Sequence, residues 1–329
     1  MRAPRLAIQT LAAMTLFATP GSAQTSLVIE YRGMCDASAA VEVGAELFVV
    51  ANDEDNRLRL YRRGSPQALQ EFDVSGFLEA GADEEVDLEG ATRAPNGLIY
   101  WITSHGANKN GKARPARRRL FATQIVHDQG SVTLKTMHHP YSGLVEDLVR
   151  EPKLAKYGFE KAARLAPEAT GGLNIEGLAS TPDGRLLIGF RNPLSGGRAL
   201  VVTLDNPDAV LDGSGKASFG DAIELDLGGS GVRSLEYVEA KAAYLIVAGP
   251  TGDEGAFKLF LWNGPGAVGV TEIRNAPVQD LQPEAVVTLP SSKEILLISD
   301  DGGRAMGGRR CKDLTPAQQL FRTRAFTLP

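Results

Sequence analysis

One arrangement of polar and apolar positions recurs along the chain, with a mean spacing of about sixty residues. In the clearest copy, a short stretch around Glu89 (residues 86–92) passes through a Pro-Asn-Gly turn into the apolar run 98–102. The same order starts again at 174, 234 and 282, and an earlier copy at 35 carries Asp where the others carry Glu. Most copies are followed by a third apolar run. Apolar runs of this length, bounded by turn residues, are typical of β-strands.

Repeated strands without helices between them predict an all-β fold, namely a β-propeller of about five blades, with six as the alternative count. Radial repetition leaves only short sheet edges exposed, which limits aggregation. The longest interval between copies contains residues 141–165, where leucines at helical spacing are interrupted by Pro152. This pattern predicts two short helices over one rim. We interpret residues 24–329 as one propeller domain that includes this insertion.

The composition favours a turn-rich β fold. The 329 residues include 36 Gly and 18 Pro, and 43% of them are apolar. So much glycine and proline suits turns better than a helical bundle. The sequence has no stretch of about eighteen apolar residues after its first 23, so we expect no membrane span. The formal net charge is −5 at pH 7, and an acidic chain is not expected to bind nucleic acid.

The first 23 residues have the features of a secretory signal peptide. Two arginines precede the mostly apolar residues 6–18, and small residues up to Ala23 form a cleavage site. We therefore expect export to the periplasm or the extracellular space. In an oxidising compartment Cys35 and Cys311 are natural disulfide partners, and a bridge between them requires the two ends of the propeller to meet. Two unpaired buried thiols are the alternative.

One acid stands at a corresponding place in each copy of the repeat. Equivalent positions of the innermost strands of a propeller face one another across the central channel. Carboxylates about 6 Å apart repel by about 3 kcal/mol at an effective dielectric constant near 20, so such a ring must protonate, pair with arginine or hold a cation. Hard oxygen ligands favour Ca²⁺ or Mg²⁺. The candidate metal ligands are Asp36, Glu89, Glu176, Glu236 and Glu284.

Two interpretations of these acids without a metal stay open. The carboxylates could accept backbone N–H groups of the neighbouring blade and so hold the blades together. Alternatively, Arg93, Arg191 and Arg233 lie near the acids in the sequence and could neutralise them. The polar stretches 52–56 and 300–302 follow second strands of the repeat, where they either add oxygen ligands or form turns.

A basic segment stands out in this acidic chain. It begins with His105, at the end of an apolar run, and gathers Lys109, Lys112 and Arg114. Arg191 ends the corresponding run of the next copy. Cations at this density suit a phosphate ester or a carboxylate, and a solvated hairpin tip is the alternative. An imidazole at the rim of a channel titrates near neutrality, which makes His105 the candidate proton-transfer group.

Motifs for nucleotides and for a serine nucleophile are not met. Residues 106–112 fit the Gly-x-x-x-x-Gly-Lys phosphate loop, but Ala113 replaces the Ser or Thr that holds Mg²⁺, and Pro115 follows where a helix should start. The sequence has no Gly-x-Ser-x-Gly elbow and no Gly-x-Gly-x-x-Gly that opens a helix after a strand. We therefore expect no nucleotide cofactor.

Several segments together resemble a family of exported bacterial proteins known as the domain of unknown function number 3616. They include VANDEDNRLRLY at 50–61, DLEGAT at 87–92, IYWITSHGANKNGKARPARRRLFAT at 99–123 and NIEGLA at 174–179. The resemblance covers nearly the whole chain after residue 23 and implies no activity. The repeated Asp/Asn-x-Glu-Gly motif is also similar to that of phytase-like and esterase-like secreted propellers. That similarity implies an acidic, Ca²⁺-assisted site for phosphate esters.

The sequence thus predicts a binding protein. Its acidic channel mouth would hold a divalent cation, Ca²⁺ or Mg²⁺, and would capture an anionic small molecule with the help of the basic segment. A metal-assisted phosphoesterase or esterase-like hydrolase is the first alternative, in which the cation activates water and His105 shuttles a proton. A protein-interaction scaffold that uses the face of the propeller is the second.

Overall fold

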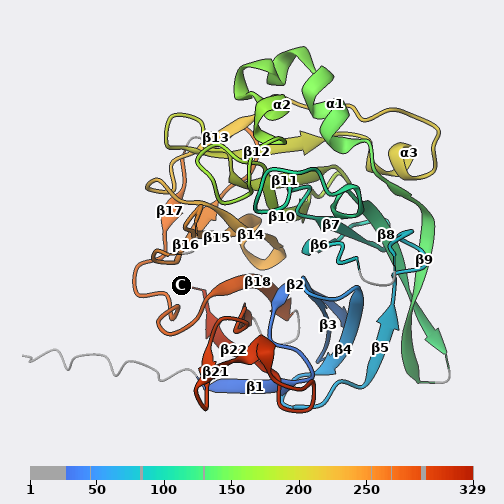
Figure 1. The fold of residues 1–329 in the computed structure, drawn as a ribbon, viewed down its shortest axis with the longest axis vertical. Coiled ribbons are helices and arrows are strands. Elements are labelled where there is room, and N and C mark those ends of the chain that lie inside the picture. The colour runs from blue at the N-terminus through green and yellow to red at the C-terminus, as the bar shows by residue number, and fades with distance from the viewer. Residues whose placement is uncertain are drawn as a thin grey trace, which may run out of the picture.

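The computed structural model describes residues 27–44, 46–81, 84–128, 130–252, 254–267, 269–289 and 294–328. The signal peptide expected at 1–23 lies outside the described residues. Five four-stranded antiparallel sheets stand around a common axis, which confirms the predicted five-bladed β-propeller (Figure 1). No helix in the described ranges is both long and apolar enough to cross a membrane.

Each blade is numbered here by its place in the ring, and its strands are given from the channel outward. The first blade consists of β2 (Ala37–Gly44), β3 (Leu47–Asn52), β4 (Arg57–Arg62) and β5 (Gln70–Asp73). The second consists of β6 (Leu88–Arg93), β7 (Leu98–Thr103), β8 (Leu120–Asp128) and β9 (Ser131–Tyr141). The third consists of β10 (Asn174–Ser180), β11 (Leu186–Asn192), β12 (Ala199–Leu204) and β13 (Ile223–Leu225).

The last two blades complete the ring. The fourth consists of β14 (Gly231–Val238), β15 (Ala243–Gly249), β16 (Lys258–Trp262) and β17 (Thr271–Glu272). The fifth consists of β18 (Pro283–Leu289), β19 (Glu294–Ser299), β22 (Leu320–Thr327) and β1 (Val28–Arg32). A small hairpin, β20 (Ala305–Met306) and β21 (Arg309–Arg310), lies outside these sheets.

The second strands of the blades account for the strongest apolar signal in the sequence. Every residue of β7, β11 and β15 is buried, because each of these strands packs between the sheets of neighbouring blades. Burial on both faces removes the alternation of polar and apolar residues and leaves a continuous apolar run. The innermost strands β2, β6, β10, β14 and β18 pack each against the next and close into a ring.

Both ends of the described chain meet in the fifth blade. Strand β1 pairs antiparallel with β22, so that Tyr31 stands opposite Phe321. Their rings stack with centroids 5.3 Å apart, and Tyr31 also meets Phe48 of the first blade edge-on. The disulfide between Cys35 and Cys311 spans 276 positions of sequence and joins Cα atoms 5.9 Å apart. The predicted pairing of these cysteines is therefore confirmed.

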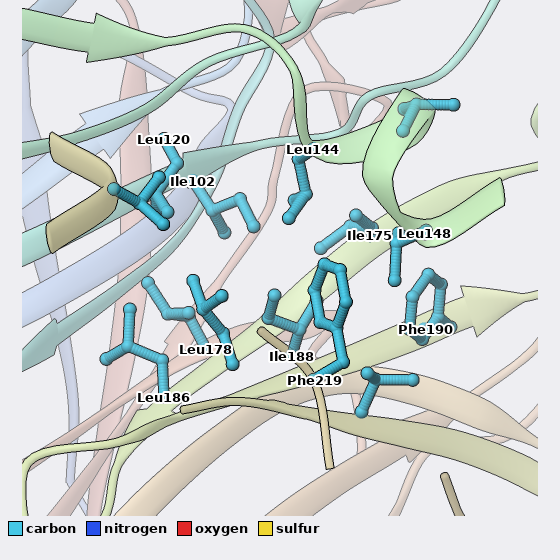
Figure 2. Packing of buried hydrophobic residues seen from close by; sticks show 14 of the residues in the cluster. Ile102, Leu120, Leu144, Leu148, Ile175, Leu178, Leu186, Ile188, Phe190 and Phe219 are labelled. Carbon is cyan, nitrogen blue, oxygen red and sulfur yellow. The ribbon is translucent and has the colours of Figure 1, made fainter. Parts of the chain in front are cut away.

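Short helices decorate the ring. They are η1 (Pro115–Arg117), α1 (Leu144–Arg150), η2 (Pro152–Tyr157), α2 (Phe159–Ala162), α3 (Pro207–Leu211), η3 (Glu239–Lys241) and η4 (Cys311–Asp313). The residues predicted as a helical insertion form α1, η2 and α2. Leu144 and Leu148 of α1 are buried in one apolar cluster with Ile175 and Phe190 of the third blade (Figure 2). The insertion thus covers the junction between the second and third blades, because this cluster also includes residues of β7 and β8.

Candidate metal and anion site at one end of the channel

A β-bulge near the start of each innermost strand builds the site. In all five blades one residue is skipped in the pairing between the innermost and second strands. An extra residue of this kind is free of the regular alternation, so its side chain can be aimed away from the sheet. The five bulge residues are Ser38, Glu89, Glu176, Arg233 and Glu284. All except Ser38 line one cavity of about 400 Å³, which we call the acidic mouth.

The bulges correct the ring of five acids expected from the sequence. In the first and fourth blades the equivalent positions hold Ser38 and Arg233, not Asp36 and Glu236. Glu236 lies three residues further along β14, or about 10 Å in an extended strand, and lines a different cavity. Asp36 precedes β2 and does not line the acidic mouth. Only Glu89, Glu176 and Glu284 come together as predicted.

Two of these three glutamates are neutralised by arginine. Arg233 lies between them, with its Nε 2.8 Å from Glu176 and its Nη2 in contact with Glu284. Arg191, which the sequence predicted as a ligand-binding residue, pairs with Glu176 over 3.0 Å and also donates to the carbonyl oxygens of Pro250 and Gly252. All of these charged groups are buried, so each carboxylate depends on its cation.

Glu89 instead lies with two aspartates. One carboxylate oxygen from each of Asp53, Asp87 and Glu89 lies within 4.8 Å of the other two, and we call these residues the carboxylate trio. Glu89 is more than nine-tenths buried, and its side chain forms no hydrogen bond or ion pair with any described residue. Oδ1 of Asp53 is also buried and accepts no hydrogen bond in the described structure. Buried carboxylates without partners are costly.

The electrostatics of the trio favour a positive occupant. At 4.8 Å two carboxylates repel by about 3 kcal/mol with an effective dielectric constant of 20. Burial, reinforced by neighbouring acids, raises the pKa of Glu89 and the pKa of Asp53 well above their ordinary values. Burial also raises the pKa of Asp87 to about 6, although Ser104 donates a hydrogen bond to it. Arg117 pairs with Asp87, but Asp53 and Glu89 form no ion pair with a described residue, so without a bound cation these two retain protons that exposed carboxylates lose.

Neighbouring blades supply the trio. Asp53 follows β3, where Oδ1 of Asn52 accepts a hydrogen bond from the backbone N–H of Glu54 and bends the chain in an Asx turn. Asp87 precedes β6 with φ of 62°, a left-handed conformation that Asp tolerates better than most residues. Its carbonyl oxygen accepts a hydrogen bond from the N–H of Ser104, which fixes it beside the end of β7.

Two further cations stand at the rim of the acidic mouth. Arg117, from the basic segment, pairs with Asp87 over 3.0 Å and also contacts Glu85. Lys312 follows the disulfide-bonded Cys311 and pairs with Glu54. The segment after α2 completes the wall through Pro167 and Glu168, whereas no residue of the insertion itself, 141–165, lines the acidic mouth.

The other cations predicted for ligand binding lie elsewhere. Lys109, Lys112 and Arg114 are exposed, and none of them lines the acidic mouth. Instead the tip of their hairpin approaches the insertion, where a Cβ on Gly111 would overlap the carbonyl oxygen of Arg164. The positive charge of these three residues therefore lies on a surface beside the acidic mouth and not inside it.

His105 is enclosed in the protein rather than at the channel rim. Its side chain is 0% exposed, and its Nδ1 lies 2.7 Å from the carbonyl oxygen of Thr103. Burial lowers the pKa of this imidazole to about 4. An imidazole with that pKa is neutral at pH 7. His105 is also not among the residues that line the acidic mouth. The geometry therefore gives no support to its predicted role in proton transfer.

Several residues of the site were missed by the sequence reasoning or given another role. Asp53 belongs to the acidic stretch 52–56, which was noted as a source of oxygen ligands. Arg233 was noted only as a neighbour of the acids. Asp87 stands two residues before Glu89 in the DLEGAT segment, and this repeat of acids at alternate positions was the available signal. Lys312 carries no sequence signal beyond its place next to Cys311.

Comparison of the sequence with protein families gives one assignment. The profile of the family described as a protein of unknown function (DUF3616) matches residues 36–129 and 115–295. The chain belongs to the DUF3616 family. This confirms the family resemblance seen in the sequence, and both matched segments contribute to the acidic mouth of this DUF3616 chain. No curated protein matches the sequence.

Solved structures with a similar outline come from several kinds of protein. The PQQ-bound aldose sugar dehydrogenase of Streptomyces coelicolor has 11% sequence identity to this DUF3616 chain and a TM-score of 0.43, over 92% of this chain and 100% of that one. A luciferin-regenerating enzyme has 9% identity and a TM-score of 0.42, over 92% and 95%. A nidogen/laminin complex has 12% identity and a TM-score of 0.40, over 80% and 72%. At these values the likeness assigns no ligand to the chain.

Proposed function

We propose that the protein binds a divalent cation, with Ca²⁺ preferred, through Asp53, Asp87 and Glu89, and that an anionic small molecule binds beside it. The observation that carries the proposal is Glu89, a buried carboxylate without a partner in the described structure that lies within reach of two other acids. Glu176 and Glu284, which the sequence offered as ligands, pair with arginines instead.

Oxygen donors from separate elements suit calcium. Ca²⁺ takes six to eight oxygen ligands in flexible geometry, whereas Mg²⁺ demands a near-ideal octahedron, and zinc prefers nitrogen and sulfur. Asp53 and Asp87 come from loops, and Glu89 comes from a bulge, so the trio is not built as a rigid octahedral cage. Waters and the anionic ligand would fill the positions that the trio leaves open.

The charge balance of the acidic mouth makes the anion depend on the cation. Seven acids and four bases line the cavity, which gives a formal charge of −3. A divalent cation reduces this value to −1 and presents a positive centre to the cavity. Arg191, Arg233 and Lys312 border the same space and would orient the anion. In the metal-free protein, repulsion from the trio opposes anion binding.

The first experiment titrates chelator-stripped protein with Ca²⁺ by calorimetry and follows thermal unfolding. We expect a single site, and at 100 times the Kd the cation should add about 2.7 kcal/mol to the free energy of unfolding. Glu89→Gln, which keeps the shape of the side chain, should abolish this binding. Asp221→Asn, an exposed acid before β13, is the matched control and should behave as the wild type. No heat and no stabilisation at millimolar Ca²⁺ would contradict the proposal.

The second experiment adds p-nitrophenyl phosphate with and without Ca²⁺. Saturable binding that requires Ca²⁺ and is lost in Glu89→Gln supports the proposed binding function. Release of p-nitrophenolate under the same conditions would assign the hydrolase alternative to the same cavity. If Ca²⁺ binds but the phosphate ester does not, the anion part of the proposal fails and the scaffold alternative gains weight.

A further inference from the structure

A second cavity, of about 480 Å³, lies at the opposite end of the channel. The acidic mouth is lined by the beginnings of innermost strands, whereas this second cavity is lined by their ends. Each blade contributes at least one polar side chain to it, and these include Glu42, Thr92, Ser180, Glu236 and Thr288. The two cavities share no lining residue, so they are separate sites.

Glu236 shares the lining of this cavity with two other acids, Glu42 and Glu239. It accepts one hydrogen bond, from Oγ1 of Thr288 at 3.2 Å, and it forms no ion pair with a described residue. The lining contains three acids and a single arginine, Arg93. The guanidinium of Arg93 already pairs with Glu42 over 3.1 Å. The cavity therefore carries a net negative charge that its own side chains do not balance.

The donor set does not suit a divalent metal. Ca²⁺ and Mg²⁺ sites in proteins combine several carboxylates, but here Glu42 pairs with Arg93 and Glu236 contacts the neutral hydroxyl group of Thr288. Val41, Ala94, two prolines and the ring of Tyr237 also line the cavity, so an occupant with an apolar body can be accommodated.

We propose that the second cavity binds a small organic cation through a primary ammonium group. Its N–H groups would donate hydrogen bonds to the Glu236 carboxylate and to the hydroxyl oxygens of Thr92 and Thr288. The carbon chain of the ligand would rest on Val41 and on the Tyr237 ring, which also attracts cations. This site is independent of the calcium site proposed above.

The proposed site predicts that the affinity for an amine depends on pH, because Glu236 must be ionised to bind it. Burial, together with the charge of Glu42 on β2, raises the pKa of Glu236 to about 8, against the hydrogen bond from Thr288. Arg93 on β6 and Glu239 of η3 are the other charged groups of the lining. An ammonium group prefers the ionised carboxylate, so it must displace the proton that Glu236 holds at lower pH. Affinity should therefore rise about tenfold from pH 6 to pH 7 and level off above pH 8.

The test measures binding of 1,4-diaminobutane by calorimetry, with 1,4-butanediol as the uncharged ligand of the same length. We expect the diamine to bind with the stated pH dependence and the diol not to bind. Glu236→Gln keeps the acceptor for Thr288 but removes the charge, and it should lose at least tenfold in affinity together with the pH dependence. Asp221→Asn, which removes an exposed acid outside both cavities, should bind the diamine as the wild type does.

A second arm distinguishes a free amine from a lysine side chain of a peptide. The tripeptide Gly-Lys-Gly is titrated beside the diamine, and whichever binds more tightly identifies the source of the ammonium group. Three results would overturn the proposal: no binding of either amine to the wild type, equal binding of diamine and diol, or unchanged binding to a folded Glu236→Gln variant. Affinity that falls as the pH rises would also overturn it, because a neutral carboxyl group would then be the binding form.

Discussion

Glu89 and Glu176 occupy equivalent bulge positions in neighbouring blades, yet their carboxylates meet different partners. Glu176 contacts two arginines and accepts a further hydrogen bond from Asn174. Glu89 meets Asp53 and Asp87 instead. The bulge fixes where each side chain points, and the side chains that neighbouring strands and loops place beside it decide whether its charge is balanced. The same backbone device thus yields a buried ion pair in one blade and a candidate metal ligand in the next.

The raised pKa values at the trio predict how the metal-free protein responds to pH. A carboxyl group whose pKa is raised on folding binds more protons in the folded than in the unfolded state, so stability falls as pH rises through that window. We expect chelator-stripped protein to lose stability between pH 5 and pH 8. Asp36, with a pKa raised to about 7, and Glu236 contribute to the same trend.

Comparison with Glu89→Gln isolates the part that comes from the trio. The variant should lose less stability than the wild type over the same pH range, because it has one carboxyl group fewer to ionise. Thermal unfolding at each pH measures the difference, and Asp221→Asn should follow the wild type. If stability falls equally with pH in Glu89→Gln and in the wild type, ionisation of Glu89 does not destabilise the folded protein and the prediction is wrong.

At the scale of elements, a small residue follows every bulge. These residues are Ala39, Gly90, Gly177, Ser234 and Ala285. A Cβ on Gly177 would stand 2.6 Å from Cγ1 of Val232 in the next blade, and one on Gly90 would stand 2.9 Å from Cβ of Leu178. The repeated Glu-Gly motif therefore combines two requirements: a side chain aimed at the channel and close packing between innermost strands.

Close packing of innermost strands predicts the effect of adding one methyl group. Gly177→Ala should lower the free energy of unfolding by about 1–3 kcal/mol, because Val232 must move to make room. Gly76→Ala is the matched control, since its Cβ would meet nothing within 4 Å and its φ is not positive, and it should change stability little. Urea denaturation measures both variants. Equal stabilities would show that the blades can separate without cost at this point.

The second strands could be predicted from the sequence because they are buried on both faces. Such strands are continuous apolar runs, which are visible without knowing the strand they pair with. The positions of the bulges could not be predicted, because a bulge is defined by pairing with another strand. Aligning the repeats on their acids therefore placed Glu236 in the ring, although Arg233 occupies the bulge of the fourth blade. The carboxylate trio was only partly visible, since Asp53 and Glu89 are neighbours solely through the contact between blades.

At the scale of the whole molecule, closure of the ring ties the chain ends to the site. The disulfide joins Cys35, just before β2, to Cys311, and Lys312 then reaches the rim of the acidic mouth. The N–H of Asp301 donates a hydrogen bond to the carbonyl oxygen of Cys35, which links the fifth blade to the first at the same point. The contacts that close the ring between the fifth and first blades therefore lie beside the acidic mouth.

Removal of the bridge should weaken the whole fold. The double variant Cys35→Ser and Cys311→Ser should lower the free energy of unfolding by about 2–5 kcal/mol, because the unfolded chain is released from a very long loop. Chemical denaturation without reductant measures the loss. Wild-type protein treated with reductant is the control and should show a comparable loss. Unchanged stability in both would mean that pairing of β1 with β22 suffices for closure.

The most direct test of the central claim is an anomalous difference map from crystals of chelator-stripped protein soaked in Ca²⁺. We predict one strong peak among Asp53, Asp87 and Glu89, at 2.3–2.6 Å from their carboxylate oxygens. Crystals of Glu89→Gln should lack that peak. A fully soaked wild-type crystal with no density at the trio, or with the ion at Glu176 and Glu284 in place of Arg233, would contradict the account.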